Sequence, residues 1–336
     1  MIVDAHNHVI PESIISYLEK DAETFGVGVD GTGDSRRLVH REGFAYPMFG
    51  EFLDPFEKVR KLDERGLDMA VISPSPTLFF YRIAGERNAE FVRLLNEQIA
   101  AFVRSAPGRL IGMGTLPMQS VEASISEIDY LVDELGIRSV MIGTHIDGVQ
   151  LADPSLRPVL RHAASRGVFI LTHPYYFGSK PGLEPYYLTN LIGNPLDTTV
   201  MAAHLIFSGT MDEIPDLKIC LSHGGGFAPY QIGRLVHGWK VRSETKTTTT
   251  SPKELLRRFY FDTITHDAEA LRYLIDFAGA DQVLVGTDIP FDMADPDPIR
   301  TLADIGLDER SKQKITAGNA INLCAPVNIR RLANAS

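Results

Sequence analysis

The sequence of 336 residues is 44% hydrophobic and 23% charged, the balance of a folded globular protein that can bury a large core. Its formal net charge is −10, and it has no lysine- or arginine-rich run, so we expect no nucleic acid partner. No apolar stretch reaches the roughly 18 residues that cross a bilayer, and the first residues do not resemble a secretory signal; we therefore expect no membrane association. Two cysteines, Cys220 and Cys324, are too few for a disulfide framework and favour a cytoplasmic location.

Short apolar runs recur along the whole chain and alternate with segments of helical periodicity. Most of these runs are apolar without alternation, as expected for parallel strands that are covered on both faces. We predict eight strands, at residues 2–8, 68–74, 110–116, 139–145, 168–174, 218–224, 259–265 and 282–288. Eight strands that alternate with helices predict a single (β/α)8 TIM barrel over residues 1–336.

Two of the intervening helices have clear end signals. Ser120 is the expected N-cap of a helix over residues 120–136 that ends at Gly136. Asp153 is the expected N-cap of the next helix, with Pro154 in its first turn and Gly167 at its end. These signals support the strand–helix alternation.

Two segments depart from that alternation. Residues 20–52 are rich in glycine and polar side chains and follow the first strand, so we interpret them as an insertion, a small β-hairpin layer that caps the barrel mouth. Residues 175–200 combine tyrosines with glycines and prolines, and we expect a long loop that shapes a pocket.

Ligand-type side chains lie at the carboxyl ends of four predicted strands, the end at which barrel enzymes place their active sites. His6 and His8 are two residues apart, so on a strand both imidazoles point to the same face. His173, His223 and Asp288 end three further strands. Taken alone, each of these residues suits a hydrogen-bonded rim position or, for Asp288, a helix cap. Together they predict a site for Zn²⁺ or a similar divalent ion with three or four protein ligands.

Four motifs resemble the landmarks of the amidohydrolase superfamily: "VDAHNH" (3–8), "LTHP" (171–174), "LSHGGG" (221–226) and "VGTDIPF" (285–291). Gly233, Arg234 and Trp239 follow the third motif with the spacing of the aminocarboxymuconate-semialdehyde decarboxylase branch. The resemblance extends over nearly the whole chain. It implies one zinc ion per subunit, held by His6, His8, His173 and Asp288.

The resemblance also implies roles for residues outside the ligand set. His223 would be the catalytic acid/base beside a metal-bound water, and Asp288 would act as a ligand, a proton carrier or both. Arg234 would bind a substrate carboxylate across the interface of a homodimer. Tyr175 and Trp239 would face a planar substrate. The histidine-rich ligand set favours zinc, with manganese or cobalt as alternatives.

The sequence departs from the superfamily and the branch at three places. Binuclear members carry a lysine at the end of the fourth strand, and "SVMIGTH" (139–145) has none, which predicts a mononuclear site. Ala45 stands where the branch has a second carboxylate-binding arginine, and Tyr175 replaces a tryptophan. We therefore expect the same metal centre, whereas the sequence does not identify the substrate.

The function predicted from these residues is a metal-dependent, non-oxidative decarboxylase of a small conjugated or aromatic carboxylate. A mononuclear hydrolase or hydratase of a ring-cleavage metabolite, such as a lactone, an amide or a diene, would use the same ligands and is the alternative. A zinc-stabilised binding protein is a third interpretation. It is disfavoured because structural zinc sites are typically closed and cysteine-rich.

Overall fold

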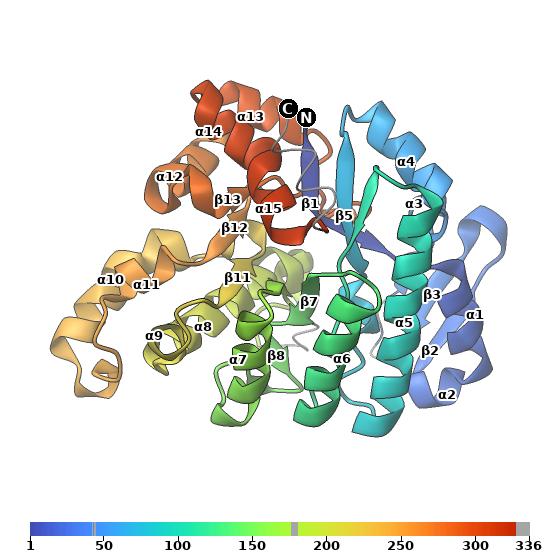
Figure 1. The fold of residues 1–336 in the computed structure, drawn as a ribbon, viewed down its shortest axis with the longest axis horizontal. Helices are drawn as coiled ribbons and strands as arrows, with labels where there is room; N and C mark the ends of the chain where they lie inside the picture. Colours follow the sequence, from blue (N-terminus) through green and yellow to red (C-terminus); the bar gives the residue numbers. More distant parts are fainter. Residues whose placement is uncertain (42, 44, 176–180, 327–336) are drawn as a thin grey trace.

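The computed structural model describes residues 1–41, 43, 45–175 and 181–326. Eight parallel strands follow one another around a barrel, and each predicted strand is present (Figure 1). They are β1 (Val3–Val9), β5 (Met69–Pro74), β6 (Leu110–Gly112), β7 (Ser139–Gly143), β10 (Phe169–His173), β11 (Lys218–Leu221), β12 (Tyr260–Asp262) and β13 (Val283–Leu284). Several end before the predicted boundary, since β11 stops at Leu221 and β13 at Leu284.

Hydrogen bonds between two strand ladders close the barrel. The ladders are β1-β5-β6 and β13-β12-β11-β10-β7. A parallel bridge between Gly114 and Val140 joins β6 to β7. On the other side, Ala5 N donates to Val285 O at 2.7 Å and joins β1 to β13. The predicted TIM barrel is thereby confirmed.

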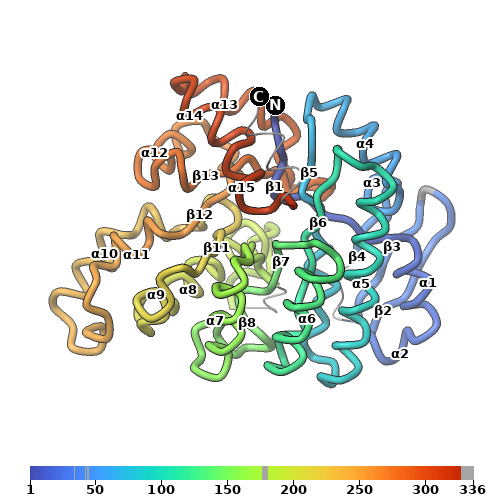
Figure 2. Tube along the Cα trace, in the orientation of Figure 1, coloured from blue at the N-terminus to red at the C-terminus, as the bar shows by residue number. Residues whose placement is uncertain are grey.

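The helices cover the outside of the barrel, as the ribbon and the Cα trace show (Figures 1 and 2). The side chain of Ser120 accepts a hydrogen bond from Ala123 N, and that of Asp153 accepts one from Ser155 N, so both predicted N-caps are confirmed. The helices are α1 (Glu12–Lys20), α2 (Ala22–Phe25), α3 (Gly50–Leu53), α4 (Pro55–Glu64), α5 (Gly85–Ser105), α6 (Val121–Asp133), α7 (Arg157–Ser165), α8 (Asn194–Phe207), α9 (Thr210–Glu213), α10 (Ala228–Val241), α11 (Pro252–Leu256), α12 (Ala268–Ala278), α13 (Pro298–Asp304), α14 (Glu309–Gln313) and α15 (Asn319–Cys324).

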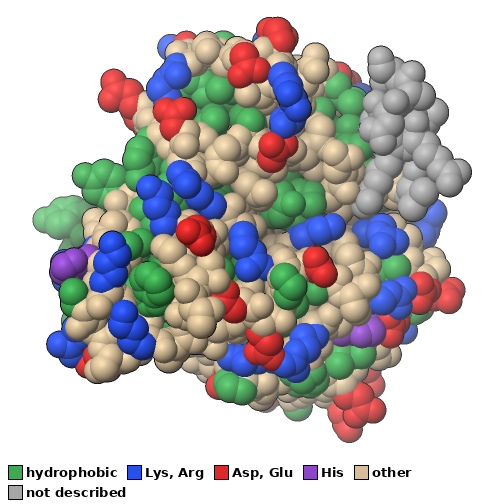
Figure 3. All heavy atoms as spheres, turned by 60° about the vertical axis from the view of Figure 1, so that its left-hand side comes forward, with side chains coloured by type: hydrophobic (Ala, Val, Ile, Leu, Met, Phe, Trp, Pro, Cys, Tyr) green, Lys and Arg blue, Asp and Glu red, His purple; other side chains and the backbone are tan. Residues whose placement is uncertain are grey.

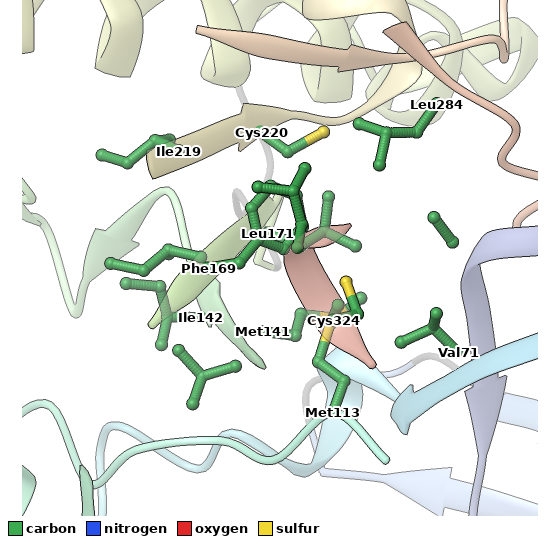
Figure 4. Packing of buried hydrophobic residues seen from close by; sticks show 14 of the residues in the cluster. Val71, Met113, Met141, Ile142, Phe169, Leu171, Ile219, Cys220, Leu284 and Cys324 are labelled. Atoms are coloured by element: carbon green, nitrogen blue, oxygen red, sulfur yellow. The ribbon is translucent and has the colours of Figure 1, made fainter. Parts of the chain in front are cut away.

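The interior of the barrel is filled with apolar side chains. Val71, Met141, Leu171 and Leu284 come from four different strands and are all buried (Figure 4). Burying such a side chain contributes on the order of 1.5–3 kcal/mol. Cys220 and Cys324 are also buried in this region and form no disulfide. This packed interior forms the floor below the carboxyl ends of the strands.

The segment between the first two barrel strands forms a small antiparallel sheet beside the barrel. Its strands are β2 (Val27–Asp30), β3 (Arg37–His40) and β4 (Ala45–Pro47), in the order β2-β3-β4. It has three strands, one more than the hairpin that we predicted. A second, smaller hairpin, β8 (His145–Ile146) and β9 (Val149–Gln150), follows β7.

The expected loop over residues 175–200 is partly helical, so that prediction is wrong for its second half. A π-helical turn spans Thr189–Gly193, and α8 begins at Asn194. Proline suggested a loop here, but Pro195 lies in the first turn of α8, where a missing N–H breaks no helical hydrogen bond. Residues 176–180 lie outside the described residues.

The surface carries charges of both signs. On the face that includes α10 and α11, lysine and arginine side chains are interspersed with acidic ones (Figure 3). Within the described part of the chain, no helix combines the length and the hydropathy that a membrane crossing requires.

The backbone of Gly226 generates the first testable prediction. Gly226 has φ of +61°, and an added Cβ would lie 2.2 Å from Pro195 O. Gly226→Ala should therefore lower the free energy of unfolding by at least about 2 kcal/mol, measured by urea denaturation. Gly238→Ala is the matched control, since Gly238 lies inside α10 with nothing within 4 Å of the added Cβ. It should stabilise by up to about 1 kcal/mol. Equal effects of the two variants would contradict the argument.

Candidate metal centre

The four predicted ligands converge at the carboxyl end of the barrel. His6 and His8 lie on one face of β1, and His173 is the last residue of β10. Asp288 comes four residues after β13, with φ of +64°, so a turn and not a strand directs its side chain. The candidate ligand atoms of all four residues lie within 4.8 Å of one another, and all four residues are buried.

The distances within this group leave room for one ion. His6 Nε2 lies 3.2 Å from His8 Nε2. Asp288 Oδ1 lies 2.8 Å from His8 Nε2, 3.5 Å from His6 Nε2 and 3.6 Å from His173 Nε2. Three ring nitrogens therefore surround one carboxylate oxygen.

The opposite nitrogen of each ring faces an acceptor. His6 Nδ1 lies 2.7 Å from Asp262 Oδ2, and His173 Nδ1 lies 2.8 Å from Pro174 O. His8 Nδ1 lies 3.3 Å from Pro74 O. Because carboxylate and carbonyl oxygens accept hydrogen bonds, these contacts favour a proton on each Nδ1 and direct the Nε2 lone pair to the centre.

Burial and charge favour the protonation states that a metal requires. Burial lowers the pKa of His8 to about 4 and that of His173 to about 3, so both rings are neutral near pH 7. Burial also opposes the charge of Asp288, but the surrounding imidazoles hold its pKa well below the usual range. Burial also opposes the charge of His6, but the hydrogen bond with Asp262 and the neighbouring carboxylates raise its pKa. Neutral nitrogen donors are therefore favoured at His8 and His173, beside an ionised carboxylate at Asp288.

These donors fit a divalent cation. His173 Nε2 is buried and has no hydrogen-bond partner among the described residues. Lone pairs that face one another across 3.2 Å repel unless a proton or a cation lies between them. Three imidazoles and one carboxylate are a ligand set typical of zinc and related divalent ions.

His223 lies beside this group and outside it. It follows β11 in a short turn with φ of +54°, and its Nε2 is 3.4 Å from Asp288 Oδ2. Its side chain is 15% exposed, more than that of any of the four predicted ligands. The imidazole can therefore reach both the centre and a bound ligand.

Asp262, at the end of β12, connects the ligand group to His223. Its Oδ2 accepts from His6 Nδ1 and from His223 N (2.9 Å), and its Oδ1 accepts from Gly224 N (2.8 Å). Asp262 is not among the site residues predicted from the sequence. It lies in the middle of the strand predicted at 259–265, so the strand-end rule that selected Asp288 does not select it; only the observed end of β12 places it at the rim.

Glycines allow this close approach. Gly286 lies close to both Asp262 and His6, because an added Cβ would come within 2.8 Å of Asp262 Cβ and 2.9 Å of His6 Cβ. Gly224 has φ of +60° in the turn that holds His223. Both positions therefore require glycine.

Two cavities meet at Asp288. The larger, about 680 Å³, is the His223 cavity, lined among others by His223, Phe227, Tyr230, Tyr273 and Asp288. The smaller, about 310 Å³, is the aromatic cavity, lined among others by Phe25, Phe80, Tyr175, Phe291 and Asp288. Both volumes suit a small organic ligand.

The predicted substrate-binding residues lie in different places. Tyr175 lines the aromatic cavity beside His173. Arg234 is exposed on α10 and lines neither cavity. Trp239 also lines neither, and its Nε1 donates to Thr248 O at 3.1 Å. Within one chain, only Tyr175 of the three is close to the centre.

The motifs and the barrel were compared with those of known proteins. The model of the amidohydrolase family matches residues 3–323. The chain belongs to the amidohydrolase family. The 2-amino-3-carboxymuconate-6-semialdehyde decarboxylase of Dictyostelium discoideum is 31% identical to this amidohydrolase over 323 residues, which cover 95% of this chain and 90% of that protein. The branch predicted from the motifs is confirmed.

Solved structures share the fold. The apo form of Metarhizium anisopliae IDCase superposes with a TM-score of 0.84 at 23% identity, covering 100% of this chain and 98% of that one. A dihydroxybenzoic acid decarboxylase from Polaromonas superposes with a TM-score of 0.75 at 22% identity, covering 96% of each chain. That structure holds manganese and the inhibitor 2-nitroresorcinol.

The contacts of Asp262 generate the second prediction. In Asp262→Asn, an amide N–H₂ at the Oδ2 position would face both His6 Nδ1–H and His223 N–H. The His6 proton would then favour Nε2 and block ligation. We expect metal affinity to fall about 10- to 100-fold, measured by competition with a chelator. Asp281→Asn, which removes an exposed partner of Lys314, should leave the affinity unchanged. Equal affinities for the two variants would contradict this role for Asp262.

Proposed function

We propose that this protein is a metal-dependent, non-oxidative decarboxylase of a small conjugated or aromatic carboxylate. The observation that carries the proposal is the position of His223, a partly exposed imidazole beside a buried three-histidine, one-carboxylate group. A likeness to the decarboxylase of Dictyostelium discoideum over 95% of this chain supports the same chemistry. A purely structural metal site is disfavoured, because Asp288 lines both cavities and the centre is open to a ligand.

The metal would be held by His6, His8, His173 and Asp288. When bound, the cation would supply a positive charge that orients the substrate's oxygen atoms and stabilises electron density that develops on the conjugated system. Zinc is the proposed ion, because neutral imidazole and carboxylate suit it in tetrahedral sites. Manganese, which the Polaromonas structure holds, is the alternative that metal analysis of purified protein would reveal.

His223 would supply the proton. Its Nε2 would transfer H⁺ to the carbon that bears the carboxylate, and the bond from that carbon to the carboxylate would then break. The electron pair of that bond returns to the conjugated system, and CO₂ leaves. In sum, R–COO⁻ and H⁺ give R–H and CO₂, and solvent in the His223 cavity reprotonates the imidazole.

Arg234 would act from a second copy of the chain. Arg234 and Tyr230 are four residues apart on α10 and share one face of that helix. Tyr230 lines the His223 cavity, yet it is 78% exposed, which is unusual for a large aromatic residue. A homodimer that covers this face would bring one copy's Arg234 towards the other copy's cavity, where the guanidinium would bind a substrate carboxylate.

CO₂ release tests the chemistry. Protein loaded with zinc is given muconate-type, salicylate-type and other hydroxybenzoate carboxylates. At least one should release CO₂, and His223→Ala should lower kcat about 100-fold or more because the proton donor is lost. His204→Ala, at an exposed position of α8, is the control that should retain activity. If fully metallated protein released no CO₂ from the panel, the decarboxylase proposal would fail. Turnover of lactones, amides or dienes would then favour a hydrolase or hydratase.

Mixing inactive variants tests the role of Arg234. His223→Ala and Arg234→Ala subunits should each be inactive alone. Random pairing makes half of the dimers mixed, and each mixed dimer has one intact site, so coexpression should restore about a quarter of wild-type activity. An activity no higher than that of either variant alone would show that Arg234 does not serve the neighbouring subunit.

A further inference from the structure

Strand β1 is irregular where it carries two of the candidate metal ligands. The step from Asp4 to Asn7 spans three residues but pairs with a two-residue step on β5. One extra residue of β1 therefore forms a bulge, and a bulge changes the direction of the side chains beside it. His6 lies within this bulge and His8 follows it, so the directions of both imidazoles depend on how the bulge is held.

A set of buried hydrogen bonds around Asp4 holds the bulge. Asp4 Oδ1 accepts from His6 N and from Thr287 N, both at 3.1 Å. Asp4 Oδ2 accepts from Asn7 Nδ2 at 2.7 Å and from Thr287 Oγ1 at 2.6 Å. Because Thr287 precedes Asp288, one carboxylate fixes both the strand that bears His6 and the turn that bears Asp288.

Lys58 of α4 joins this set from the other side of Asn7. Its side chain is 0% exposed, and Nζ donates to Asn7 Oδ1 at 2.7 Å and to His8 O at 3.1 Å. Glu51 Oε1 lies farther away, 3.6 Å from Nζ. Glu51 is also bound by two N–H groups of Arg65, at 2.6 and 3.0 Å. The ammonium is therefore closer to its acceptors on β1 than to the Glu51 carboxylate.

Stability gives little reason for a cation at this position. A buried charge is costly to desolvate, and replacing buried ionic groups by apolar side chains of similar volume is often neutral or stabilising. The two acceptors of Lys58 instead point to the ligands, since Asn7 lies between His6 and His8 and the second acceptor is the carbonyl of His8 itself.

We propose that Lys58 is a positioning residue for the metal centre. Its ammonium fixes the Asn7 side chain and the His8 carbonyl, and the bulge held in this way keeps Nε2 of His6 and Nε2 of His8 directed to one point, 3.2 Å apart. Lys58 acts through the ligands and contacts no reacting atom. The inference rests on the metal site of the proposed function and is independent of whether the reaction is a decarboxylation.

Co²⁺ binding tests this role without turnover. Apo protein is titrated with Co²⁺, whose visible absorption reports the arrangement of its ligands. Lys58→Met keeps the length of the side chain but removes the charge and the donors. Its Co²⁺ affinity should fall about 10- to 100-fold, and the absorption of the saturated protein should change. A merely structural lysine would alter neither readout of the folded protein, so unchanged affinity and absorption would overturn the proposal.

Two controls separate positioning from stability. Lys61→Met makes the same change at a side chain of α4 that is 34% exposed and should alter neither readout. Glu51→Gln removes a buried carboxylate but leaves both contacts of Lys58 with β1, so it should lower the free energy of unfolding and retain the Co²⁺ affinity. An equal loss of affinity in Glu51→Gln and Lys58→Met would show that general destabilisation is the cause, and the proposal would fail.

A second variant covers the case in which Lys58→Met does not fold. Lys58→Gln is polar but one bond shorter, so it cannot make both contacts, and the same loss of affinity is expected. Wild-type protein that bound no Co²⁺ would overturn the metal site and this role together. Intact Co²⁺ binding that depends on Lys58, without CO₂ release, would instead support the role of Lys58 and overturn only the decarboxylase chemistry.

Discussion

Repulsion between the buried ligand atoms of the metal centre must be balanced by the structure around them. Three imidazole nitrogens and a carboxylate face one another at buried positions, and burial of such groups is costly without a compensating charge. The barrel withstands this cost because its core below the site is closely packed and because each imidazole is fixed through its other nitrogen. A bound cation would convert the repulsion into ligation, so metal affinity and fold stability are coupled.

Asp262 makes the centre a single unit. One carboxylate accepts from the ring of His6 and from the backbone of His223, so a ligand candidate and the proposed proton donor share one support. The glycines at 224 and 286 permit this, since a Cβ at either position would collide with a neighbouring side chain. A displacement of β12 would therefore disturb metal binding and proton transfer together.

The sequence predicted the parts of the structure that follow from periodicity. Parallel strands bring their carboxyl ends to one rim, so the spacing of His6 and His8 and the positions of His173 and Asp288 were sufficient to expect their convergence. The strand ends were less predictable. His223 and Asp288 leave their strands in turns with positive φ, a conformation set by the hydrogen bonds of the folded turn and not by local propensity. Asp262 was missed because the strand predicted at 259–265 ran past it, whereas β12 ends at Asp262, and because no motif drew attention to it.

Contacts between distant segments could not be predicted at all. His40 is buried and lines the aromatic cavity, although nothing in the insertion distinguishes it from a surface histidine. Arg82 reaches the same cavity from the segment after β5. Its position relative to β4 and β8 depends on tertiary packing and not on local sequence. The candidate metal ligands come from the ends of the barrel strands, whereas much of the lining of the aromatic cavity comes from the insertion and from loops. Because the barrel strands and the segments that line this cavity are separate in sequence, a substitution such as Ala45 can change which carboxylate is bound without disturbing the residues that would hold the metal.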